Sequence, residues 1–231
     1  MEVRERLSDS RNYRRGRALP VSYLVVHYTG NRGDTAKDNA DYFAAGARDA
    51  SAHYFVDEDE VWRSVPEGDT AWHCGGAAYL HDGCRNGNSI GIEVCMWDKA
   101  GGLRPGSIQR AAELCRELMD RYGIDAGHVL RHYDVTGKRC PAPMVDDPAL
   151  WAQFKEAIDM TRDEVQALVD RALEAREAVR YDTMDQVPAW GRETVRKLMA
   201  KGALRGDGGG LGLSYDLLRV LVINDRTGLY D

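Results

Sequence analysis

Long hydrophobic runs are missing from this sequence of 231 residues. No stretch approaches the roughly 18 consecutive apolar residues of a membrane-spanning helix, so we expect no membrane span. The segment at residues 1–20 is charged and does not have the apolar core of a secretory signal peptide. We therefore expect a protein made in the cytoplasm, which reaches any substrate outside the cell by a route that the sequence does not show.

The sequence also has no excess of positive charge. Its 31 Lys and Arg are outnumbered by 37 Asp and Glu, which gives a formal net charge of −6. A protein that binds duplex nucleic acid normally presents a basic face, so we expect no nucleic-acid partner. The arginines near the N-terminus are interpreted as a solvated leader and not as a nucleic-acid patch. They are Arg11, Arg14, Arg15 and Arg17.

The chain has no CxxC or HExxH motif, so no compact metal-binding signature is present. It has five cysteines, an odd number that favours reduced thiols over a framework of disulfides. Cys95 and Cys115 fall in apolar strand and helix patterns and are expected in the core. Cys140 lies in a different setting, described below.

Strand and helix patterns alternate along the first two thirds of the chain. Strands are predicted at 22–28, 52–56, 61–65, 89–97 and 129–131, and helices at 35–45, 105–122 and 150–158. The acidic turn at 57–60 is typical of a hairpin between two of these strands. Residues 134–143 are predicted to form a loop. This order predicts an α/β fold with a mixed central β-sheet flanked by helices, followed by a small C-terminal helical module.

Three parts are predicted from these patterns: a domain at residues 1–160, a helical connector at 161–180 and a small helical module at 181–231. The connector opens with the capping-box pattern Thr161-Arg162-Asp163-Glu164. The last part has only about 50 residues, near the lower limit for independent folding. We expect it to lean on a partner surface or to form a dimer with a second copy.

Two histidines and one cysteine have the placement of metal ligands. His27 lies near the end of a buried strand, and His132 lies eight residues before Cys140 across a loop that contains Gly137. Two imidazoles and a thiolate are good zinc donors, and three protein ligands leave a fourth tetrahedral position open for water. His128, twelve residues before Cys140, is the rival of His132.

Five ordered segments resemble the zinc-dependent N-acetylmuramoyl-L-alanine amidases, above all their phage endolysin and autolysin branch. These enzymes are related to the animal peptidoglycan recognition proteins. The segments are VVHYTGN (25–31), SAHYFVDEDEVW (51–62), TAWHCGG (70–76), NSIGIEVC (88–95) and HYDVTGKRCP (132–141). The resemblance covers roughly residues 20–160. It implies hydrolysis of the amide bond between N-acetylmuramic acid and L-alanine in bacterial peptidoglycan, with Zn²⁺ as cofactor.

The resemblance also assigns roles to residues. Its zinc ligands fall on His27, His132 and Cys140. Its catalytic lysine falls on Lys138, which would offer positive charge to the oxyanion. Its acidic residue falls on Glu93, which would pass a proton from water to the leaving amine.

One departure bears on the catalytic base. Part of the family has a catalytic tyrosine where this chain has Ala52, so we assign the base to Glu93. Strand alternation predicts that Tyr54 shares the face of Ala52, two residues further along.

Further contacts with the glycan and peptide are expected from His73, Trp72 and His53, with Trp62 and Trp97 as additional aromatic candidates. His73 would line the substrate groove or support a zinc ligand from behind.

Two other functions remain open at this point. One is a catalytically inactive peptidoglycan-binding module, although Cys140 together with both histidines argues against it. The other is a zinc peptidase that cuts within the stem peptide. The protein would act on the wall after release, as an endolysin does, or on fragments recycled in the cytoplasm. The tail from Tyr181 loosely resembles surface-layer homology repeats and the C-terminal modules of prophage amidases, which favours wall binding or dimerisation.

Overall fold

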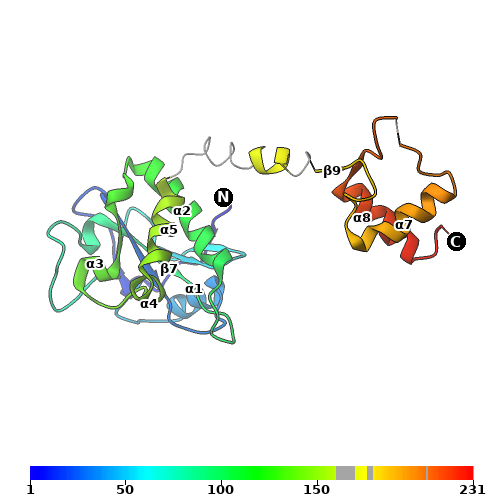
Figure 1. Ribbon diagram of the computed structural model, residues 1–231. Coiled ribbons are helices and arrows are strands. Elements are labelled where there is room, and N and C mark those ends of the chain that lie inside the picture. The colour runs from blue at the N-terminus through cyan, green and yellow to red at the C-terminus, as the bar shows by residue number, and fades with distance from the viewer. Residues whose placement is uncertain (160–169, 176–178, 207, 231) are drawn as a thin grey trace. The chain divides into compact units, whose positions relative to one another are not determined.

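The computed structural model describes residues 1–159, 170–175, 179–206 and 208–230 (Figure 1). The chain divides into two compact units, Met1–Met160 and Thr161–Asp231. We describe each unit by itself. The predicted capping box at 161–164, and the first part of the connector helix that follows it, lie outside the described residues.

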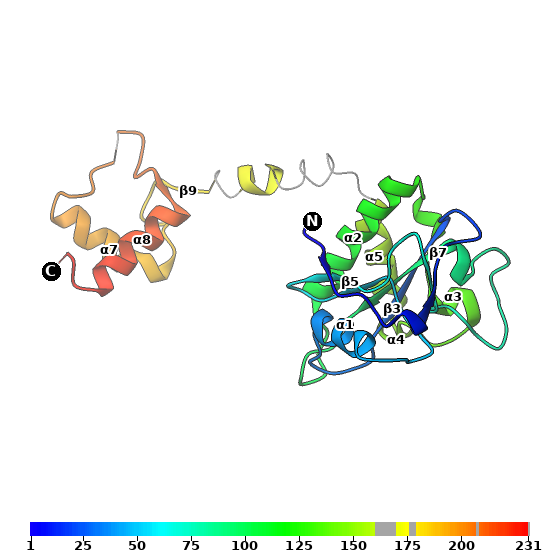
Figure 2. The same cartoon turned by 180° about the vertical axis from the view of Figure 1, so that it is seen from behind.

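A six-stranded mixed sheet forms the centre of the first unit, in the order β1-β5-β4-β7-β3-β8 (Figures 1 and 2). Only the β4–β5 pair is antiparallel among these strands. The strands are β1 (Arg4–Glu5), β5 (Val61–Arg63), β4 (Tyr54–Val56), β7 (Ser89–Val94), β3 (Tyr23–Tyr28) and β8 (Val129–Arg131). The predicted mixed sheet and the hairpin across the acidic turn are confirmed.

One face of the sheet is covered by α2 (Pro105–Tyr122) and α5 (Pro148–Asp159), which lie side by side in both views (Figures 1 and 2). Pro105 at the first turn and Gly123 in the left-handed conformation set the bounds of α2. The core on this face takes alternate residues of the central strands. They include Leu24, Val26, Ile90, Ile92, Val94 and, from the helices, Leu114, Leu118 and Phe154.

The opposite face carries α1 (Ala36–Ala44), whose start is fixed by a capping box between Thr35 and Asp38. Ala36 and Ala40 pack against the sheet. Tyr42 of the same helix is 55% exposed, and the guanidinium of Arg48 lies 4.1 Å from the centre of its ring.

Short elements account for the other differences from the sequence-based expectation. The segment predicted as a loop overlaps the end of α3 (His132–Thr136) and the start of α4 (Ala142–Asp146). The N-terminal segment is not a free leader, because β1 adds an edge strand and β2 (Tyr13–Arg14) pairs with β6 (Thr70–Ala71). Three single turns of 3₁₀ helix complete the unit: Ser10–Asn12, Asn86–Asn88 and Ala126–His128.

From residue 179 on, the described part of the second unit forms two helices, each preceded by one strand of a small antiparallel ribbon. Its described elements are β9 (Arg180–Tyr181), α7 (Ala189–Ala200), β10 (Leu213–Ser214) and α8 (Tyr215–Arg226). Its own core contains Val187, Val195, Leu213, Leu218 and Val222.

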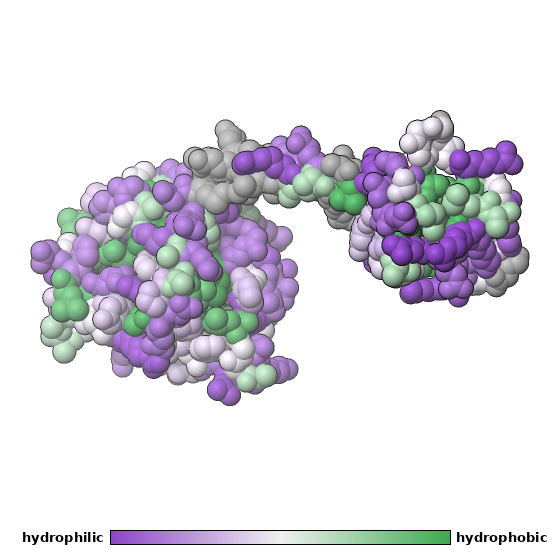
Figure 3. All heavy atoms as spheres, in the orientation of Figure 1, coloured by the Kyte–Doolittle hydropathy of each residue, from purple (hydrophilic) through white to green (hydrophobic). Residues whose placement is uncertain are grey.

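In the described part of the chain, no helix combines the length and the apolar character that crossing a membrane requires. Hydrophobic and hydrophilic side chains are interspersed on the face that Figure 3 shows.

Candidate active site

The site begins with the register of two parallel strands. His27 of β3 and Glu93 of β7 are direct partners in the ladder, so their side chains stand next to each other on the same face of the sheet. His27 Nδ1 lies 4.0 Å from Glu93 Oε1. Each residue comes one position before the end of its strand, which places both at the carboxyl edge of the sheet.

His132 and Cys140 reach the same point from the other side of β3. β8 pairs with β3 and ends at Arg131, so His132 opens α3 directly beside the end of β3. Gly137 ends α3 with a φ of 79°, and the chain then returns so that Tyr133 N donates a hydrogen bond of 2.8 Å to Cys140 O. This return brings the thiol of Cys140 to His27 at the carboxyl edge of the sheet.

The three predicted metal ligands converge. Their ligand atoms all lie within 4.8 Å of one another, and Cys140 Sγ is 3.7 Å from His27 Nδ1. All three residues are buried, and the rings of His27 and His132 have their centroids 4.7 Å apart. His128, the rival ligand, is exposed and bonded to Asp125, outside this cluster.

The protonation chemistry of the cluster fits a metal ion. Neither ring nitrogen of His132 makes a hydrogen bond with any residue that the structure describes, although both are buried. An imidazole buried without a partner is costly. Burial, reinforced by the charge of Lys138, lowers the pKa of His132 to about 4, which keeps the ring neutral and its lone pair available. Burial raises the pKa of the Cys140 thiol to about 12, and a bound cation would reverse this effect. Two neutral imidazoles and one thiolate match zinc.

A one-way hydrogen-bond relay fixes the orientation of His27. Ser89 Oγ donates to the carbonyl of Arg85 at 2.7 Å and therefore accepts from His73 Nε2 at 3.1 Å. His73 Nδ1 is then left to accept from His27 Nε2, also at 3.1 Å. The proton assignment follows from the network. It leaves the lone pair of His27 Nδ1 directed towards Cys140.

Space for His73 depends on Gly91 of β7. A Cβ atom at that position would lie 2.4 Å from Cγ of the His73 ring, so a larger residue would displace the ring. The glycine of the SIGIE segment therefore leaves room for the His73 ring beside His27.

A cavity of about 350 Å³ opens over the cluster. It is lined by His27, Tyr28, Thr29, Gly30, Phe43, Ala50, Ser51, Ala52, Phe55, Trp72, His73, Glu93, Lys138, Arg139 and Cys140. Glu93 Oε2 makes no hydrogen bond within the described chain. Burial raises the pKa of Glu93 to about 8, against the opposing influence of Lys138. The structure thus places the carboxyl group of Glu93, an exposed lysine and the ligand cluster around one space, and a cation bound there would favour the ionised form of Glu93.

Not every predicted contact residue reaches the cavity. His53 is fully buried beneath it, where its Nδ1 accepts a hydrogen bond of 2.9 Å from Gly91 N. Arg17, predicted in the solvated leader, instead reaches inside: it donates to Ser89 O at 3.0 Å and lies 2.6 Å from His53 Nε2. Neither Trp62 nor Trp97 belongs to the cavity lining.

Ala52 lines the cavity, whereas Tyr54 belongs to the core on the other face and bonds to Glu67. The prediction that the two residues share a face is wrong, because β4 begins only at Tyr54 and the alternation does not extend back to Ala52. Phe55 was missed, although it is the ladder partner of Glu93. Thr29 and Arg139 were also missed, and their closeness in sequence to His27 and Cys140 was the available signal.

Comparison with known proteins agrees with this geometry. The family model described as N-acetylmuramoyl-L-alanine amidase matches residues 17–143. The chain belongs to this amidase family. The resemblance seen in the five sequence segments is thereby confirmed. The matched region contains all three candidate ligands, Glu93 and Lys138.

Two curated members of the amidase family illustrate the similarity. CwlL of Bacillus licheniformis is 37% identical over 154 residues, which are 60% of this chain and 41% of CwlL. XlyA of Bacillus subtilis (strain 168) is 33% identical over 151 residues, 64% of this chain and 47% of XlyA. This chain thus spans less than half the length of these relatives.

Solved structures support the fold. The catalytic domain of XlyA superimposes with a TM-score of 0.59 at 29% identity, covering 68% of this chain and 99% of that domain. PlyL gives 0.60 at 26% identity and covers 69% and 98%. The predicted fold class is confirmed.

Proposed function

We propose that this protein hydrolyses the amide bond between N-acetylmuramic acid and L-alanine in bacterial peptidoglycan, with zinc held by His27, His132 and Cys140. The observation that carries the proposal is the pairing of Glu93 with His27 at the sheet edge, where His27 also belongs to the convergent His-His-Cys cluster. Membership of the amidase family, shown by the match over 17–143, specifies the bond.

The chemistry divides among a few groups. When bound, zinc would supply a Lewis acid that activates water and polarises a carbonyl oxygen. Glu93 would accept a proton from the attacking water and return it to the amine nitrogen as the carbon–nitrogen bond breaks. Lys138 would stabilise negative charge on the carbonyl oxygen as the water oxygen adds. The products are a free lactyl carboxylate and an L-alanine amine.

The rest of the cavity would bind and orient the substrate. Trp72, 37% exposed, offers an indole face to the glycan or the peptide. His73 contributes through His27, which it holds from behind. We propose peptidoglycan of the cell wall as the site of action after release, and fragments recycled in the cytoplasm as the alternative substrate.

The test is digestion of purified peptidoglycan by the full chain, followed by labelling of new amino termini. We expect new L-alanine termini, their loss with a chelator and their recovery with added zinc. Cys140→Ser and His132→Ala should lose bound zinc and activity together, while His128→Ala should keep both. New termini from within the stem peptide would instead identify a peptidase, and binding without release would identify an inactive binding module. New reducing sugar ends would identify a glycosidase and overturn the proposal.

A further inference from the structure

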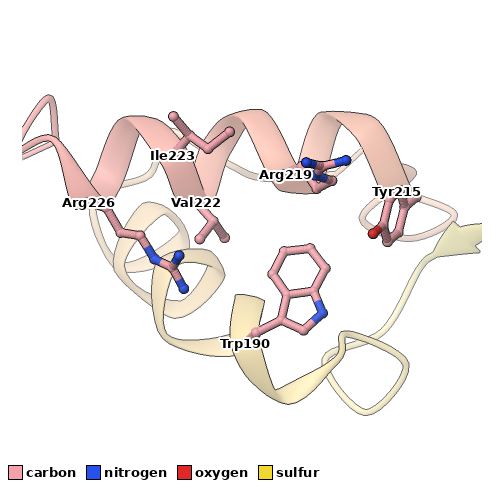
Figure 4. Close-up of a pocket in the computed structure, with 6 residues that line it drawn as sticks. All are labelled: Trp190, Tyr215, Arg219, Val222, Ile223 and Arg226. Carbon is pink, nitrogen blue, oxygen red and sulfur yellow. The ribbon is translucent and has the colours of Figure 1, made fainter. Parts of the chain in front are cut away.

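The second unit has a cavity of its own, of about 420 Å³. Trp190 lines it from α7, and the other lining residues come from α8 (Figure 4). They are Tyr215, Arg219, Val222, Ile223 and Arg226. The family match ends at residue 143, so nothing in the amidase assignment accounts for this space.

The frame of this cavity is held by close contact between the two helices. A Cβ atom at Gly191 would lie 2.9 Å from the Leu218 side chain, so the glycine lets α7 approach α8 beside Trp190. Further along, Asp225 of α8 accepts hydrogen bonds from Thr194 at 2.6 Å and Lys197 at 2.8 Å. The packing at Gly191 and the hydrogen bonds of Asp225 thus both join α7, which carries Trp190, to α8.

Two positively charged side chains line the cavity. Arg219 and Arg226 are exposed, and neither makes an ion pair or a side-chain hydrogen bond with the residues that the structure describes. Arg219 does lie 5.8 Å from the ring centre of Tyr215. The two arginines are seven residues apart, which is about 10 Å along a helix. A ligand with two anionic groups at that separation would satisfy both guanidinium groups.

The other four lining residues are apolar or aromatic. Trp190 is 41% exposed and its ring meets that of Tyr215 at a centroid distance of 6.0 Å and an angle of 79°. Ile223 is 54% exposed. Exposed aromatic rings of this kind pack against the carbon-bearing faces of sugars, and a few polar groups then fix the orientation.

We propose that this cavity binds an acidic glycopeptide of the bacterial wall, with sugar rings against Trp190 and Tyr215 and stem-peptide carboxylates on Arg219 and Arg226. The guanidinium fork matches the two oxygens of a carboxylate. A glycerol-phosphate polymer would supply charge but little surface for the aromatic and apolar half of the lining. The cavity would anchor the protein to its wall substrate, and this binding does not depend on the proposed hydrolysis.

The test measures binding of a soluble disaccharide-tetrapeptide to the full chain by calorimetry. Every protein carries Glu93→Gln, so that the ligand stays intact. Calorimetry should show one binding site in the second unit. Its affinity for the glycopeptide should fall at least tenfold with each of Arg219→Gln, Arg226→Gln and Trp190→Ala. Arg196→Gln removes an exposed arginine of α7 outside the cavity lining and should leave this site unchanged. Trp72→Ala, in the other cavity, should leave it unchanged as well.

Two further ligands and one measurement of oligomeric state distinguish the glycopeptide from other possible occupants of the cavity. A neutral chitin oligosaccharide should bind at least tenfold more weakly than the glycopeptide. Equal affinity for the two would overturn the role of the arginines. Poly(glycerol phosphate) binding in place of the glycopeptide would overturn the proposal. A dimer that needs Trp190, in a protein that does not bind glycopeptide, would overturn it too. In the chain with Glu93 restored, Arg219→Gln should not change the rate at which a soluble substrate is hydrolysed. Failure of the binding proposal can therefore be told apart from failure of the proposed amidase activity.

Discussion

Glu93 is the residue on which the proposed hydrolysis depends most directly. Glu93→Gln keeps the size of the side chain but removes its ability to accept a proton. We expect the variant to retain zinc and to lose turnover by about a hundredfold or more, the usual contribution of a general base. Metal analysis and initial rates measure the two effects separately. Glu156→Gln, on the exposed face of α5, is the matched control. Full activity of the Glu93 variant would show that another group is the base.

His73 offers a prediction about positioning. The relay from Ser89 through His73 to His27 holds one tautomer of this proposed metal ligand. We expect His73→Ala to weaken zinc binding about 10–100-fold, as the loss of such partners typically does. Competition with a chelator gives the affinity, and His128→Ala serves as the control. If the variant keeps its zinc affinity and only KM rises, His73 contacts the substrate and does not orient the ligand.

The site residues differ in how far the sequence could specify them. His27, Glu93 and Cys140 could be assigned because they stand in recognisable segments, and strand alternation gives the face of His27 and Glu93. The sequence could not place Arg17, because its contacts with Ser89 and His53 join segments far apart in the chain. Such long-range polar contacts produce no periodic pattern in the amino-acid sequence.

At the scale of elements, Glu67 joins the loop after β5 to the end of α2 through hydrogen bonds. Its carboxylate accepts hydrogen bonds from Tyr54, Tyr122 and Arg121. Burial alone would raise the pKa of Glu67, but these donors outweigh it and the pKa is lowered. The carboxylate thus stabilises the folded unit whenever it is ionised. We expect Glu67→Gln to destabilise the first unit by about 1–3 kcal/mol at neutral pH.

The sign of the pH dependence follows from the lowered pKa of Glu67. Its stabilising effect is fully present above the unfolded-state value of about 4.5 and is lost as the pH falls through the lower folded-state value. The difference in unfolding free energy between the native chain and Glu67→Gln should therefore shrink as the pH falls below about 4.5. Urea unfolding at several pH values measures it, with Glu156→Gln as control. A difference that grows in acid would contradict the lowered pKa.

Long elements were predictable and most short ones were not. The helix at 105–122 matches α2, and the strand predicted at 22–28 matches β3 to within one residue. Their apolar periodicity, together with Pro105, carries a strong local signal. Strands of two residues such as β1 and β6 exist only because a neighbouring segment pairs with them. No local sequence pattern predicts such a strand.

For the whole molecule, the two units have separate hydrophobic cores. The clusters of the first unit draw on residues between 21 and 158, and that of the second on residues between 181 and 222. No residue belongs to both sets among those described. Cores that share no residues are expected to unfold independently.

Reciprocal core substitutions in the full chain test this independence. Leu218→Ala should cost about 2–5 kcal/mol in the second unit. Because so small a unit has little stability to lose, its calorimetric transition should disappear while the first unit's transition stays in place. Leu114→Ala, the matched change in the first core, should lower only the first transition. A drop of both midpoints with either substitution would mean that the units fold cooperatively. Independent transitions would mean that the proposed wall binding and the proposed hydrolysis can be altered separately, one unit at a time.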